Sequence, residues 1–149
     1  MRTLIAMFFV ALSTLVLGVG GVSASSAPVT WSFDVSFDSA ATMVNGVPTW
    51  TGSASGPGSG TIAVKLVAAD ARGEALHIEL EVTVAAGAQS STARLAGVFN
   101  EVTTRAVLNG VVSSGWLAGA QAHQEAARFD PASSARLTGT LRLMAGSTG

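Results

Sequence analysis

The stretch that decides the fold is residues 76–84, Leu-His-Ile-Glu-Leu-Glu-Val-Thr-Val. Every second side chain in it is apolar, and polar side chains fill the positions between: the apolar set is Leu76, Ile78, Leu80, Val82 and Val84, and the polar set is His77, Glu79, Glu81 and Thr83. Successive side chains of a β-strand point to opposite faces of the sheet. The stretch therefore predicts a strand with one buried face and one solvated face.

The same alternation appears on both sides of this strand. It recurs over residues 31–37, where every second residue is aromatic or valine, over residues 62–68 and over residues 137–143. Turn signals separate these runs: Asn45-Gly46 and Asn109-Gly110 are typical of tight hairpins, residues 70–73 form a polar turn, and the glycine-rich residues 52–60 indicate a turn, a bulge or a corner. Antiparallel strands joined by short turns follow from this pattern.

Two regions fit either a strand or a helix. Residues 91–108 carry apolar side chains at helical spacing behind possible capping residues, although their β-branched content and Gly97 favour strands. Residues 116–129 are rich in small side chains and fit a long strand or a helix equally well. The sequence leaves both alternatives open.

The expected fold class is all-β. Seven or eight short strands with turns between them predict a small antiparallel β-barrel, with a two-sheet β-sandwich as the alternative. Glycines at positions 52, 97, 119 and 139 favour the barrel, because a tightly curled sheet needs small residues at its corners.

The N-terminus has the order of a secretory signal. Arg2 precedes an apolar stretch, Gly18, Gly20 and Gly21 interrupt it, and Val22-Ser23-Ala24 offers small residues to a signal peptidase. We therefore expect a signal helix in residues 1–24, cleavage after Ala24, and a single β domain in residues 25–149 that ends in a short flexible tail. The expected location is secreted, periplasmic or in the cell envelope, with membrane contact only through the signal segment; an uncleaved anchor over residues 4–22 is the alternative.

Composition excludes several classes of function. The chain has no cysteine, so disulfides, thiolate metal sites and cysteine nucleophiles are absent. Its net charge of −1 and single lysine, Lys65, give no basic surface for nucleic acid. Ala54 occupies the central position of Gly52-Ser53-Ala54-Ser55-Gly56, where a serine-hydrolase elbow needs serine.

One short pattern that could carry chemistry occurs twice, as His77-x-Glu79 and His123-x-Glu125. On strands, each pair projects from one face. If the two strands were neighbours, the four side chains could bind a divalent metal or act as general acid and base. The alternative is that each pair belongs to the solvated face of an amphipathic strand, and the sequence predicts no cofactor.

Large aromatic side chains suggest a different function. Trp31, Phe33, Trp50 and Trp116 are the candidates for lining an apolar cavity, and their alternative role is the hydrophobic core. Three hypotheses result. The chain is an exported, non-enzymatic domain that binds a small apolar ligand; it is a structural or cell-surface protein that binds another envelope protein; or it is an enzyme or metal-binding protein that uses the two His-x-Glu pairs.

Overall fold

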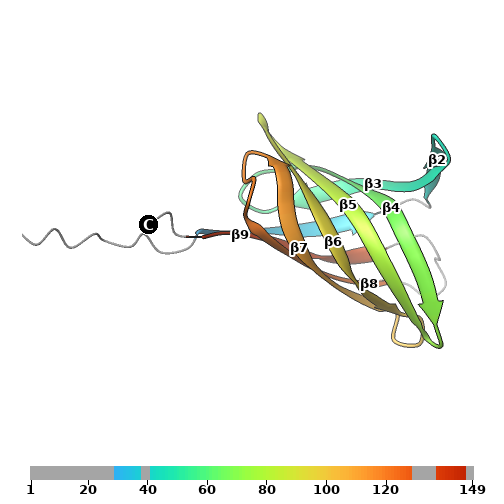
Figure 1. The fold of residues 1–149 in the computed structure, drawn as a ribbon. Helices are drawn as coiled ribbons and strands as arrows, with labels where there is room; N and C mark the ends of the chain where they lie inside the picture. Colours follow the sequence, from blue (N-terminus) through green and yellow to red (C-terminus); the bar gives the residue numbers. More distant parts are fainter. Residues whose placement is uncertain (1–28, 38–40, 129–136, 147–149) are drawn as a thin grey trace, which may run out of the picture.

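The computed structural model describes residues 29–37, 41–128 and 137–146. The expected signal segment, its cleavage site and the last three residues lie outside these ranges. Within them all regular secondary structure is β, in agreement with the expected class. The strands are β1 (Val29–Phe37), β2 (Thr42–Val44), β3 (Val47–Ser55), β4 (Gly60–Arg72), β5 (Ala75–Ala86), β6 (Gln89–Asn100), β7 (Arg105–Gly115), β8 (Gln121–Arg128) and β9 (Leu137–Ala145) (Figure 1).

The strands form one antiparallel sheet that closes on itself. Its order is β1-β9-β8-β7-β6-β5-β4-β3-β2, and β1 also pairs with β3, so eight strands make a ring and the short β2 lies outside it on β3. Asp34, Val35 and Ser36 of β1 pair with Ser55, Ala54 and Ser53 of β3 at the closing seam. Closure removes the free edges that an open sheet would expose along these strands.

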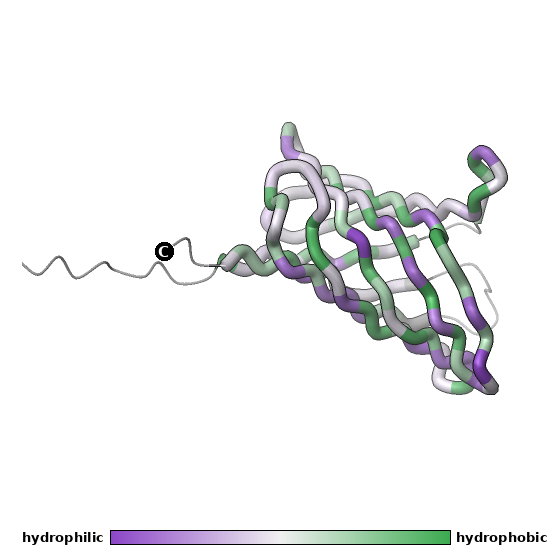
Figure 2. Tube along the Cα trace, in the orientation of Figure 1, coloured by the Kyte–Doolittle hydropathy of each residue, from purple (hydrophilic) through white to green (hydrophobic). Residues whose placement is uncertain are grey.

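The core lies inside the ring. The decisive stretch is the middle of β5, and Leu80, Val82 and Val84 in it are buried. Phe33, Val35 and Phe37 of β1 are also buried, as the alternation in residues 31–37 predicts. Hydrophobic and hydrophilic residues alternate along the strands in Figure 2, which is the pattern of a sheet with an apolar inner face and a polar outer face.

In both ambiguous regions the described residues form strands and turns and no helix, and residue 129 lies outside the described ranges. Residues 91–108 belong to β6 and β7 with the turn of residues 101–104 between them, and residues 116–120 form a turn that leads into β8. Tertiary pairing decides these segments, because each strand forms hydrogen bonds with a neighbour on both sides. None of the described residues forms a helix that could cross a membrane.

One hairpin signal is confirmed and the other is wrong. Asn45 and Gly46 have φ of 51° and 78° and form the tight turn between β2 and β3. Asn109 and Gly110 instead lie in the middle of β7. A Cβ at residue 110 would stand 1.8 Å from the carbonyl oxygen of Arg94, so this glycine allows close approach of β6 and makes no turn.

Three further details differ from the expectation. Asp70–Arg72 extend β4, and the turn to β5 is Gly73-Glu74. A bulge between Leu66 and Ala68 moves Ala68 to the outer face, where it pairs with Glu79. Gly119 has φ of 88° and lies in the turn before β8, outside any strand.

Candidate functional site

The ring of strands has two ends, and each end is identified by the turns that lie there. At the first end, β1 begins and β9 ends, and the turns β3–β4, β5–β6 and β7–β8 lie close by (Figure 1). At the second end are the turns β2–β3, β4–β5 and β6–β7. The backbone N–H of Glu101 donates to the carbonyl of Glu74 at 3.1 Å and joins two of these turns.

At the first end two of the four candidate aromatic residues lie together. The rings of Trp31 and Trp116 meet edge to face with centroids 4.4 Å apart, a favourable geometry for aromatic pairs. Ser91 stabilises the turn that carries Trp116, because its Oγ accepts the backbone N–H of Leu117 at 3.2 Å. Leu117 packs against the core and Ala120 is buried, so this turn covers the interior.

The other two candidates lie deeper and at the opposite end. Phe33 is fully buried in the core, one inner position along β1 from Trp31. Trp50 lies on β3 towards the second end and is half-buried. Half-buried apolar side chains from neighbouring strands also pack against the core near this end: Leu66 of β4, Ile78 of β5, Phe99 of β6 and Ala126 of β8. Trp31, Phe33 and Trp50 therefore lie along the interior of the ring at different depths, whereas Trp116, which is 36% exposed, lies on the turn at its first end.

A polar residue that the sequence analysis did not single out lies inside the ring. Gln124 of β8 is 2% exposed, and its Oε1 has no hydrogen-bond partner among the described residues. It alternates with His123 and Glu125, so it shares the inner face with Ala122 and Ala126. The alternation Ala-His-Gln-Glu-Ala contains this signal, but it indicates an inner glutamine only once the segment is known to be a strand.

The two His-x-Glu pairs lie on the outer face and are not neighbours. His77 and Glu79 belong to β5, whereas His123 and Glu125 belong to β8, and β6 and β7 lie between these strands. Three strand spacings correspond to about 14 Å. The neighbouring arrangement that a shared metal site requires is therefore not formed. No cluster of three or more metal-ligating side chains occurs in the part of the chain that the structure describes.

His123 is engaged by two oxygen atoms. Its Nδ1 lies 2.6 Å from Oδ1 of Asn109, and its Nε2 lies 3.0 Å from Oε1 of Glu125. The hydrogen bond to His123 lowers the pKa of Glu125 from its ordinary 4.5, and the charges of His123, Arg142 and Arg105 act in the same direction. Both ring nitrogens of His123 therefore lie within hydrogen-bond distance of a side-chain oxygen atom.

The other pair borders a shallow hollow of about 460 Å³ on the outer face of β4, β5 and β6. Asp70, Arg72, His77 and Glu79 line it together with alanines and Gly97. Its charged groups form ion pairs, because Arg72 Nε lies 2.9 Å from Asp70 Oδ2, and Arg94 Nε lies 3.1 Å from Glu79 Oε1. These contacts are typical of a solvated face.

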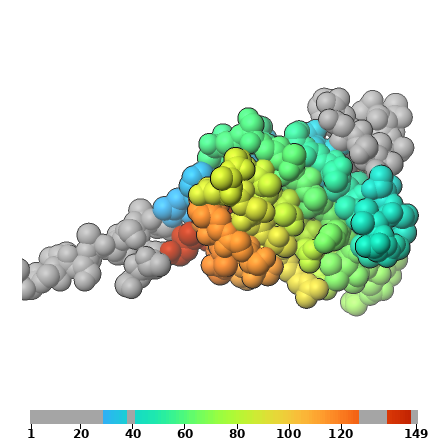
Figure 3. All heavy atoms as spheres, turned by 90° about the horizontal axis from the view of Figure 1, so that it is seen from above, coloured from blue at the N-terminus to red at the C-terminus, as the bar shows by residue number. Residues whose placement is uncertain are grey.

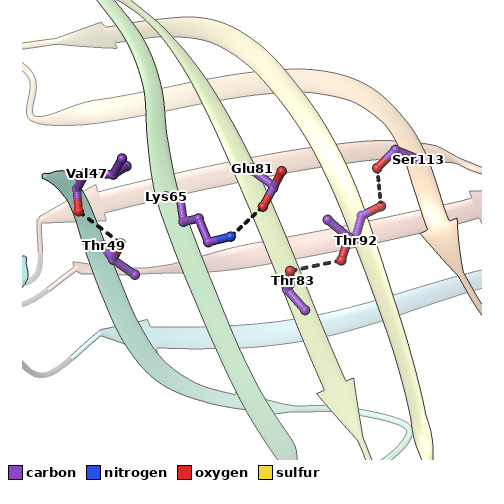
Figure 4. Close-up of polar contacts among 7 residues, drawn as sticks. All are labelled: Val47, Thr49, Lys65, Glu81, Thr83, Thr92 and Ser113. Carbon is purple, nitrogen blue, oxygen red and sulfur yellow. Dashed lines mark hydrogen bonds and ion pairs between the residues drawn. The ribbon is translucent and has the colours of Figure 1, made fainter. Parts of the chain in front are cut away.

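Similar polar contacts continue across the outer wall (Figure 4). Lys65 Nζ lies 2.8 Å from Glu81 Oε1, and the hydroxyls of Thr83 and Thr92 share a hydrogen bond of 2.9 Å. Ser113 Oγ donates to the carbonyl of Thr92 at 3.0 Å. Polar groups thus join neighbouring strands on the outer wall, where Val107 and Val111 of β7 are exposed apolar exceptions, and the buried apolar side chains face inward.

The space-filling view in Figure 3 shows the β2–β3 hairpin projecting from the body of the ring, as it does in Figure 1. Met43 is 66% exposed, and Val44 and Val47 beside it are also exposed. The tip is therefore apolar but small.

Comparison with known proteins adds no assignment: the chain matches no protein-family model and no curated protein. Functional inference consequently depends on the geometry of the chain itself.

Proposed function

We propose that the chain is an exported β-barrel that binds a small apolar ligand inside the ring of eight strands. The observation that carries this proposal is the direction of the apolar surface. Core side chains face inward from every strand of the ring, and half-buried apolar ones lie at both ends, with more of the large ones towards the second end, where the β4–β5 and β6–β7 turns lie. Barrels of eight strands enclose an interior that is either filled by side chains or holds one small ligand.

The two ends differ in a way that supports entry at the second end. Trp31 at the first end is covered by Trp116 and by the turn that follows it. Trp31 and Leu117 are the large half-buried core side chains at the first end, whereas Trp50, Leu66, Ile78 and Phe99 are half-buried at the second end. An apolar molecule that enters there would gain contact with these side chains and exclude water from them.

Native mass spectrometry tests this function directly. The chain is purified from an exporting host without detergent, and its intact mass is compared before and after denaturation. A bound mass in the lipid or metabolite range that denaturation releases is the expected result. A bare chain that also fails to bind an apolar fluorescent probe would contradict the proposal.

A pair of variants locates the site. Trp50→Ala removes a half-buried inner side chain and should weaken binding of the apolar probe by about tenfold, which corresponds to roughly 1.4 kcal/mol. Val107→Ala is the control, because Val107 is 50% exposed on β7 and faces outward. Equal losses in both variants would place the bound probe outside the ring.

The projecting β2–β3 tip supports a second candidate, a structural or cell-surface role in which the tip binds another envelope protein. Met43 and Val44 are its most exposed apolar side chains. Cross-linking from residue 43 in intact exporting cells should then capture a partner, and Met43→Ser with Val44→Ser should abolish the capture.

A further inference from the structure

The side-chain carbonyl oxygen of Gln124 indicates which chemical group the proposed ligand carries. Its Oε1 is buried and has no hydrogen-bond partner among the described residues. Leu108 of β7 and Leu141 of β9 are its cross-strand neighbours, and both are buried and apolar. Neither side chain can donate a hydrogen bond, so the surroundings of this carbonyl leave it unsatisfied.

An unsatisfied buried carbonyl destabilises a protein, and leucine at this position would avoid the cost. Native structures pair nearly all buried polar atoms, so each exception needs an explanation, such as a ligand or an ordered water. Polar atoms placed in an otherwise apolar interior are also what orients a ligand in a pocket. Gln124 is therefore suited to orient a ligand in this interior through one hydrogen bond.

The inner-face row next to Gln124 and its two leucine neighbours, on the side of the second end, consists of small residues. On the inner face, the next position towards the second end is alanine or glycine on each of three neighbouring strands: Ala106 on β7, Ala126 on β8 and Gly139 on β9. Ala126 and Gly139 are partly exposed. The amide thus lies one inner row from partly exposed residues, and that row contributes little side-chain volume.

The charge of the buried inner side chains limits the charge that the proposed ligand can carry. The buried polar residues in the described ranges are Thr49, Ser91 and Gln124; Thr49 pairs with Lys65 on the outer face, and Ser91 and Gln124, on the inner face, are uncharged. A carboxylate or ammonium beside Gln124 would lose its hydration and find no counter-ion among these described buried side chains. A neutral donor such as a hydroxyl would not carry this cost.

We propose that Gln124 Oε1 accepts a hydrogen bond from a neutral hydroxyl on an otherwise apolar ligand. This inference rests on the proposed ligand-binding function and narrows it to apolar alcohols. The hydroxyl lies deepest, beside Gln124, and the hydrocarbon part extends past the row of Ala106, Ala126 and Gly139 towards Trp50 and Phe99.

A matched pair of probes tests the inference: 1-decanol, which has a hydroxyl donor, and its methyl ether, which has the same chain without one. Each is titrated against a bound apolar fluorophore. The expected result is that the wild-type chain binds the alcohol about tenfold more tightly than the ether. Gln124→Leu should remove that preference while it retains binding of the ether.

Control variants separate the role of Gln124 from a general effect of substitution. Gln121 begins the same strand but is exposed, so Gln121→Leu should keep the preference for the alcohol. Gln124→Met preserves the length of the side chain, and it replaces Gln124→Leu as the test if that variant does not fold.

The outcomes distinguish this inference from the function on which it rests. A wild-type chain that binds neither probe would overturn both proposals. Equal binding of alcohol and ether by the wild-type chain would overturn the role of Gln124 and leave the ligand-binding function standing. Loss of the preference in Gln121→Leu as well as in Gln124→Leu would also overturn it.

Discussion

Gly110 shows how closely neighbouring strands approach each other in this ring. A methyl group there would stand 1.8 Å from the carbonyl oxygen of Arg94 and 3.0 Å from the Cα of Leu95, both of which are backbone atoms of β6. Gly110→Ala should therefore lower the free energy of unfolding by at least about 2 kcal/mol, because the strands must separate to admit the methyl group. Urea denaturation measures the change.

Gly58 provides the control for this substitution. A methyl group at Gly58 would make only an ordinary contact with Ala86 Cβ at 3.6 Å, and its φ is not in the left-handed region. Gly58→Ala should change stability by no more than about 0.5 kcal/mol. Similar losses in the two variants would show that the close approach at residue 110 does not limit stability.

The His123–Glu125 contact makes a residue-scale prediction about pH. The pKa of Glu125 is lowered, chiefly by its hydrogen bond to His123, so the folded state favours the carboxylate. The resulting stabilisation is present above the unfolded-state pKa and is lost as the pH falls through the lowered pKa. His123→Ala should raise the pKa of Glu125 towards 4.5 in an NMR titration.

His77→Ala is the matched control, because His77 lies on β5, and β6 and β7 separate β5 from β8. It should leave the titration of Glu125 unchanged. A pKa of Glu125 that does not respond to His123→Ala would assign the shift to Arg142 and Arg105 instead.

Ion pairs between neighbouring strands on the outer wall should contribute little to the free energy of unfolding. Lys65 and Glu81 join β4 to β5 at 2.8 Å, but their side chains are 51% and 36% exposed. Exposed pairs of this kind contribute about 0.2–1 kcal/mol. A double-mutant cycle with alanine at both positions should give a coupling energy in this range that decreases with added salt. A larger coupling that salt does not change would indicate that the pair is shielded from water.

At the scale of the whole molecule, the closing seam is the shortest pairing in the ring. β1 and β3 share three paired positions, whereas β5 and β6 share twelve and β1 and β9 share nine. Short pairings open at lower free energy than long ones, so we expect amide protons at the seam to exchange faster. Native-state hydrogen exchange by NMR measures both sides of β1 at once.

Strand β1 contains its own control in this experiment, since one edge pairs with β3 and the other with β9. Faster exchange of the amides that face β3 is the expected result. Equal protection on both edges of β1 would mean that the ring opens only by global unfolding.

Local sequence patterns are sufficient to predict the most regular strands and the direction of their faces. Alternation in residues 31–37 and 76–84 needs no tertiary information, because the two-residue period of a strand separates apolar from polar side chains. The Asn45-Gly46 turn is equally local, since φ above zero is available to these residue types.

Other features depend on which strands are neighbours, and these follow only from the tertiary structure. Asn109-Gly110 has the composition of a turn, but pairing with β6 and β8 keeps it extended within β7. The separation of the two His-x-Glu pairs and the contact between Trp31 and Trp116 depend on strand order, which local patterns do not encode. Gln124 became a candidate only after β8 was placed in the ring, because the same residue on an isolated segment has no inside to face.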